Sequence, residues 1–197
     1  MNRQELLKVI RPIAPFKKAP IFILVAFCLM MQSLSTDLYV ASLPALGKAF
    51  DASPSIVQLT LSVFMVAFGF AQLIAGPLSD RFGRRPVLVF GLMLYVLASA
   101  ACALSFSIWL LITARFFQAL GCCASLIVAR AIVRDAYAPE HGMQIMVRAS
   151  SWLSVTPMLV PIIGAYLQVC FGWRGSFVLH TILSAALAIA IYLHLPE

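Results

Sequence analysis

The chain has 197 residues, of which 62% are hydrophobic and only 11% are charged. Soluble domains carry about 25% charged residues, so the composition excludes an ordinary soluble protein and indicates a membrane protein. A formal net charge of +7 would suggest nucleic acid as the partner of a soluble protein, but here the basic residues sort by side of the membrane and no nucleic acid is expected.

Residues 1–19 form a basic segment, which we expect to be cytoplasmic. It contains Arg3, Lys8, Arg11, Lys17 and Lys18. The apolar run that follows is too long for a secretory signal, and five more runs come after it. We therefore interpret the first run as a retained transmembrane helix.

Six apolar runs are each long enough to cross a hydrocarbon core of about 30 Å. The expected spans cover residues 20–46, 55–79, 86–105, 107–130, 143–170 and 173–195. The sequence thus predicts an all-α membrane protein, with a six-helix transmembrane domain over residues 20–197. Eleven of the fourteen Lys and Arg residues precede the first span or lie in the two loops on the same side of the membrane. The positive-inside rule then places both termini in the cytoplasm.

The spans contain two deep charges of opposite sign, Asp37 and Arg115. Charges inside a bilayer are costly, and they usually face a bundle interior or water and serve a function. At 1.5 Å per residue, Asp37 lies about 13 Å from the outer end of its helix at Leu46, and Arg115 about 12 Å from Ser107. The two side chains are predicted to share one layer. They could couple protons to transport, form a structural ion pair, or be solvated separately.

In the coupling hypothesis Asp37 carries a proton, and Arg115, helped by Gln118, sets its proton affinity. A nearby cation favours the ionised carboxylate, whereas a dry apolar environment favours the neutral acid. Gln32 and Tyr39 could line the substrate path beside these charges.

One face of the second span carries small and polar residues at alternating steps of four and three. The residues of this polar stripe are Gln58, Ser62, Met65, Gly69, Gln72 and Gly76. In lipid such a face points toward another helix or a water-filled cavity. It could pack inside the bundle or form a sliding surface against a second domain. We favour the sliding surface, because the two glutamines need polar partners.

The later spans add two features. In span five, Pro157 and Pro161 leave backbone carbonyls unpaired and predict a bent helix, with Gly164 one turn further on. In span six, His180 lies near the layer of the two deep charges. It is expected to be a hydrogen-bonded packing residue rather than a proton relay.

The turn between spans two and three reads GPLSDRFGRRP over residues 76–86. This run resembles the G-x-L-[AS]-D-R-x-G-R-[RK] signature of the major facilitator superfamily, at the position where the hydropathy places a cytoplasmic turn. In that family the equivalents of Asp80 and Arg84 stabilise the outward-facing state. The resemblance therefore assigns a gating role to Gly76, Asp80, Arg81, Gly83, Arg84 and Arg85, and Asp135 after span four could join Arg84.

Three further segments agree with this resemblance. Residues 115–121 (RFFQALG) resemble the R-x-x-Q-G-x-G element, with Ala119 in place of the middle glycine. Residues 160–165 (VPIIGA) resemble the antiporter element G-P-x-x-G-G, with two glycines replaced. Residues 36–39 (TDLY) resemble the first helix of the Bcr/CflA-type drug-efflux subfamily.

The resemblance implies a function and a missing part. Family members have twelve spans in two halves with substrate bound between them, so this chain is expected to be an N-terminal half. Its partner would be a C-terminal six-helix half or a second copy of the chain. The expected function is proton-coupled efflux of drug-like or lipophilic compounds across a bacterial inner membrane, driven by the proton gradient without a cofactor. The alternatives are transport of another small solute, or a half that does not transport alone.

An enzyme is not expected. The sequence has no HExxH zinc motif, no paired carboxylates and no glycine loop that could cradle a phosphate.

Overall fold

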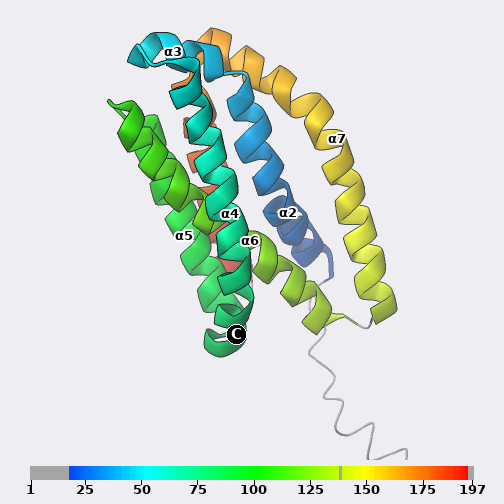
Figure 1. Cartoon of the computed structure of the whole chain (residues 1–197). Helices are drawn as coiled ribbons and strands as arrows, with labels where there is room; N and C mark the ends of the chain where they lie inside the picture. Colours follow the sequence, from blue (N-terminus) through cyan, green and yellow to red (C-terminus); the bar gives the residue numbers. More distant parts are fainter. Residues whose placement is uncertain (1–17, 138, 195–197) are drawn as a thin grey trace, which may run out of the picture.

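The computed structural model describes residues 18–137 and 139–194, so all but the last two residues of the expected N-terminal segment 1–19 lie outside the described residues. Regular structure in the described part of the chain is helical throughout. Figure 1 shows α2 (Lys18–Val40), α3 (Leu43–Phe50), α4 (Pro54–Phe82), α5 (Arg84–Ala103), α6 (Ile108–Ala136), α7 (Pro139–Phe171) and α8 (Arg174–His194).

The first expected span, 20–46, is not one continuous helix. It divides into α2 and α3, whose axes differ by 58°. Pro44 explains the break, because its ring clashes with the carbonyl of Val40 and it has no N–H to donate to that carbonyl. A tight turn replaces the helix, with the Ser42 N–H donating to the Tyr39 carbonyl at 2.8 Å. In consequence α3 lies across the end of the bundle (Figure 1).

The helices over the other five expected spans differ from them at their ends. α4 continues to Phe82 and α6 to Ala136, so both carry basic residues in their last turns. α7 begins at Pro139, before the expected position 143. By length and composition α4, α5, α6, α7 and α8 can each cross a membrane, and the α2–α3 pair can form a sixth, broken span.

α6 is the central helix of the bundle and packs against α5, α4 and α2. Its contact with α5 is close at Gly121, where an added Cβ would lie 2.5 Å from the Gly91 carbonyl oxygen. α7 packs mainly along α2, and α8 mainly along α5. Figure 1 shows α7 as a long arc on the outside of the bundle.

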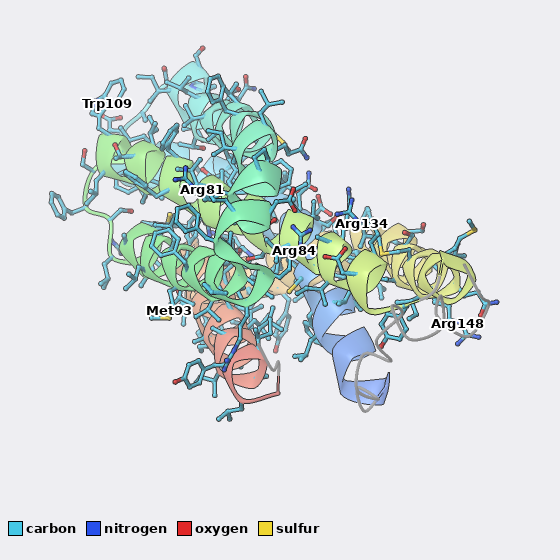
Figure 2. The ribbon with its side chains drawn as sticks, turned by 90° about the horizontal axis from the view of Figure 1, so that it is seen from below. Arg81, Arg84, Met93, Trp109, Arg134 and Arg148 are labelled. Carbon is cyan, nitrogen blue, oxygen red and sulfur yellow. The ribbon has the colours of Figure 1, made fainter. Side chains whose placement is uncertain are left out.

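Basic residues gather at one end of the bundle, where α4 and α6 end and α5 and α7 begin. We call this the basic end, and its described arginines are Arg81, Arg84, Arg85, Arg130, Arg134 and Arg148. Four of them are labelled in Figure 2, which views the molecule from that end.

Candidate functional site

The side chain of Arg115, on α6, is completely buried. Its Nη1 donates to the backbone carbonyl of Ser35 on α2 at 3.1 Å and to Oε1 of Gln118 at 2.8 Å. Residues 115 and 118 are neighbours on one helix face, which explains why Gln118 can orient the guanidinium. The sequence-based pairing of these two residues is present in the structure.

Aromatic rings from three helices surround the same guanidinium. Its carbon lies 3.9 Å from the ring centre of Tyr39 on α2, 4.8 Å from that of Phe64 on α4 and 5.6 Å from that of Phe177 on α8. The negative face of an aromatic ring attracts a cation, most strongly where water is absent. The rings therefore offset part of the cost of burying the charge.

A polar network extends from Arg115 to α5. Gln118 Nε2 donates to the Ser99 hydroxyl at 2.8 Å, and the hydroxyls of Ser35 and Tyr95 are 2.5 Å apart. Sequence reasoning did not assign Ser35, Tyr95 or Ser99 to the site. Their only signal was a hydroxyl in an apolar span, which helices also satisfy locally with their own carbonyls.

The cation is nevertheless incompletely paired. Arg115 Nε and Nη2 are buried and have no hydrogen-bond partner among the described residues. An unpaired buried charge destabilises a protein, and an ionisable residue inside a membrane is a candidate for a functional site.

Asp37 is not the counter-ion of Arg115. It is partly buried, with Oδ1 accepting from the Thr36 hydroxyl at 3.0 Å, while Oδ2 is buried without a partner in the described structure. Ser35 and Tyr39 face Arg115. Asp37 is two residues away from each of them, and two residues correspond to a rotation of about 200° around the helix axis. The two charges thus lie at similar depth but on different sides of α2. Of the alternatives considered from the sequence, the structural ion pair is not formed.

Three other residues were predicted near this layer. Tyr39 is buried, and its hydroxyl hydrogen-bonds to that of Thr60 on α4. Gln32 is partly buried one turn before Thr36, whose hydroxyl lies 3.2 Å from its carbonyl. His180 is buried, with Nε2 3.1 Å from the Leu34 carbonyl. That contact agrees with a packing role for His180.

Arg84 joins three helices at the basic end. Its Nη1 lies 2.6 Å from Oδ1 of Asp80 on α4, and its Nε 2.9 Å from Oδ2 of Asp135 on α6. The same Nη1 donates to the Ser79 hydroxyl at 2.5 Å. The contact between Arg84 and Asp135 that the sequence suggested is therefore present.

The rest of the sequence signature is arranged around this cluster. Gly83 has φ +93°, which explains the glycine between α4 and α5. Arg81 lies against the ring of Phe82 (5.4 Å to its centre), and Arg85 donates to the Tyr192 carbonyl at 3.0 Å. Gly76 has open space where a Cβ would be, so no packing within this bundle requires it.

α7 contains Pro157 and Pro161 within one continuous helix, and its arc in Figure 1 agrees with the predicted bend. Gly164 has a role that sequence reasoning missed. A Cβ there would lie 2.7 Å from the Leu38 carbonyl oxygen, so glycine permits close contact between α7 and α2.

The polar stripe of α4 is on the outside of this bundle. Gln58, Ser62, Met65, Gly69 and Gln72 are exposed. Packing inside the bundle is therefore not the explanation of the stripe, whereas a contact with a second domain agrees with it.

The described residues contain no group of three or more His, Cys, Asp or Glu side chains that could hold a metal ion. The candidate site is thus a buried guanidinium with a separate carboxylate, and a charged cluster at one end of the helices.

A family model described as "Major Facilitator Superfamily" matches residues 25–197. The chain belongs to this superfamily. The fold class expected from the sequence is confirmed: an all-α membrane protein whose six-helix bundle corresponds to the N-terminal half of a major facilitator fold.

Three relatives illustrate the similarity. The chain is 38% identical over 149 residues (75% of this chain, 36% of the relative) to a chloramphenicol resistance protein of Pseudomonas aeruginosa. It is 36% identical over 170 residues (85% and 42%) to the uncharacterized MFS-type transporter YdgK of Bacillus subtilis. It is 29% identical over 157 residues (79% and 40%) to the multidrug resistance protein MdtL of Escherichia coli.

These superfamily members carry names of transporters and resistance proteins, not of enzymes. The chain spans only 36–42% of their length. A crystal structure of a mutant of peptide transporter POT in complex with alafosfalin has the same fold. The two structures superpose with a TM-score of 0.75 and are 16% identical in sequence. The match covers 98% of this chain and 42% of the POT chain.

Proposed function

We propose that this chain is the N-terminal half of a proton-coupled exporter of drug-like or lipophilic compounds, of the Bcr/CflA type. It would lie in a bacterial inner membrane with both ends on the cytoplasmic side. Membership of the major facilitator superfamily supports transport, and the similarity to resistance proteins of Pseudomonas aeruginosa and Escherichia coli supports efflux.

The observation that carries the mechanism is the separation of Asp37 from Arg115. A carboxylate paired with a guanidinium would stay ionised, whereas Asp37 has one oxygen without a partner among the described residues. We propose that Asp37 carries the coupled proton, because a dry environment favours a neutral acid, whereas water or a nearby cation favours the carboxylate. In this proposal Arg115, with Gln118, is the fixed charge of the same layer.

Asp37→Asn tests this proposal, because asparagine keeps the shape of the side chain but cannot titrate. In the complete transporter that we propose, efflux of a lipophilic cation should fall to the level seen with a protonophore, while the amount of inserted protein stays the same. The readout is the rate of dye efflux from energised membrane vesicles.

Asp51→Asn is the matched control. Asp51 follows α3 and has a positive φ of 48°, which asparagine also adopts readily. Efflux should be unchanged in this variant. Proton-driven efflux that survives Asp37→Asn would disprove the assignment.

A second candidate is a half that does not transport alone, and the exposed polar stripe of α4 favours it. That surface would then meet a C-terminal half or a second copy. Reconstitution of the chain by itself tests this candidate. A lone half should show no dye uptake driven by a pH gradient, and uptake by the chain alone would refute it.

A further inference from the structure

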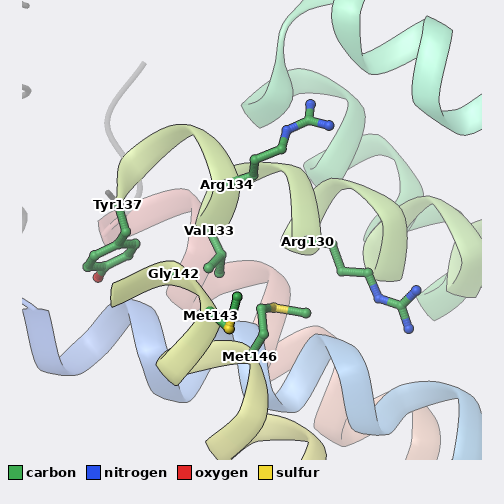
Figure 3. A pocket seen from close by; sticks show the side chains of 7 residues that line it. All are labelled: Arg130, Val133, Arg134, Tyr137, Gly142, Met143 and Met146. Atoms are coloured by element: carbon green, nitrogen blue, oxygen red, sulfur yellow. The ribbon is translucent and has the colours of Figure 1, made fainter. Parts of the chain in front are cut away.

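A pocket of about 240 Å³ lies between the end of α6 and the first turns of α7, at the basic end. Figure 3 shows its lining: Arg130, Val133, Arg134, Tyr137, Gly142, Met143 and Met146. None of these residues was described at the buried Arg115 or in the ion-pair cluster of Asp80, Arg84 and Asp135. Sequence reasoning used Arg130 and Arg134 only to predict the topology.

The lining combines an apolar centre with a basic rim. Val133, Met143 and Met146 lie together at the centre in Figure 3, and methionine side chains adapt to irregular apolar ligands. Arg130 and Arg134 extend outward from α6, one helical turn apart. The hydroxyl of Tyr137 is buried and has no hydrogen-bond partner within the described part of the chain.

The two arginines are poorly neutralised. No described residue forms an ion pair with Arg130, and Arg134 contacts Asp135 at 3.4 Å. That carboxylate is already held by Arg84 at 2.9 Å. The rim of the pocket therefore has positive charge available for an anion.

The depth of the pocket identifies the kind of anion. About 20 helical residues cross the hydrocarbon core, so a span that starts at Ile108 leaves the core near position 128. Arg130, Arg134 and Tyr137 then lie at the level of the lipid head groups. Basic pockets between helices at this level are suited to anionic head groups.

We propose that this pocket binds an anionic phospholipid. The phosphate group lies at the basic rim that Arg130 and Arg134 form, and the glycerol and the first part of an acyl chain contact Met143 and Met146. The proposal does not depend on proton coupling or on the transported compound.

Native mass spectrometry of the chain in detergent tests the proposal, with dioleoyl phosphatidylglycerol and dioleoyl phosphatidylcholine as probes. Phosphatidylglycerol should bind in preference, with one tight site. The double variant Arg130→Gln/Arg134→Gln should weaken that site roughly 30-fold, since each arginine near the surface contributes about 1 kcal/mol.

Arg81→Gln/Arg148→Gln is the matched control, because it removes the same charge from the same end of the bundle without touching the pocket. It should retain the tight site. Equal binding of the two lipids, or equal loss in both double variants, would overturn the proposal. Displacement of phosphatidylglycerol by millimolar inorganic phosphate would also overturn it, since the site would then take a free anion rather than a lipid.

Discussion

Two arginines of this protein lie in contrasting environments. Arg174, at the start of α8, donates to the carbonyls of Ala103 and Ser105 at 3.0 and 3.1 Å. It thereby supplies hydrogen-bond donors to carbonyl groups at and just after the end of α5. Arg115 is buried with two of its three guanidinium nitrogens unpartnered in the described structure. The first arrangement stabilises the fold, and the second is costly to it.

This contrast predicts opposite effects of the same substitution. Arg115→Met should leave the thermal midpoint in detergent unchanged or higher, because an apolar side chain removes the burial cost, whereas transport by the complete protein should be lost. Arg174→Met should lower the free energy of unfolding by about 1 kcal/mol. Transport by this variant should remain proportional to the amount of folded protein. A large loss of stability in Arg115→Met would show that the buried charge is structural.

At the scale of the elements, α7 is the least buried of the five helices that are long enough to cross a membrane. It packs mainly on α2, and large apolar residues such as Met158, Ile162 and Tyr166 are exposed along it. Gly164 allows that packing, because its backbone lies directly against Leu38. The sequence predicted the bend of this helix from its prolines, but not the contact, because the neighbour of a helix cannot be read from its own pattern.

Gly164→Ala should therefore separate α7 from α2. Overpacking of this kind costs about 1–3 kcal/mol, which should appear as a lower thermal midpoint. Gly69→Ala is the control, because nothing lies within 4 Å of a Cβ at that position, and its stability should rise slightly with helix propensity. Similar midpoints for the two variants would contradict the close contact.

At the scale of the whole molecule, Arg84 holds the ends of α4, α5 and α6 together through Asp80 and Asp135. The side chains of Asp80 and Asp135 are 62% and 47% exposed, so these ion pairs contribute little to the stability of the bundle. In the proposed transporter we expect them to act where the bundle meets another domain, which is also where the exposed polar stripe of α4 would act.

Asp80→Asn should accordingly separate stability from function. The variant should insert and unfold like the parent, within about 1 kcal/mol, but the complete transporter should lose efflux. The measurements are the thermal midpoint of the purified protein and the rate of dye efflux. Retained transport would refute the gating role.

The amino-acid sequence by itself determined the six apolar spans, the all-α fold and the superfamily, because span length and a long turn motif are local properties of the chain. It also identified Asp37 and Arg115 as deep charges, because depth follows from counting residues along a helix. Only the tertiary structure decided that these charges do not pair, that aromatic rings from three helices enclose Arg115, and that Pro44 divides the first span. The reason is that partners depend on the rotation and contacts of each helix within the bundle, and no local pattern specifies these.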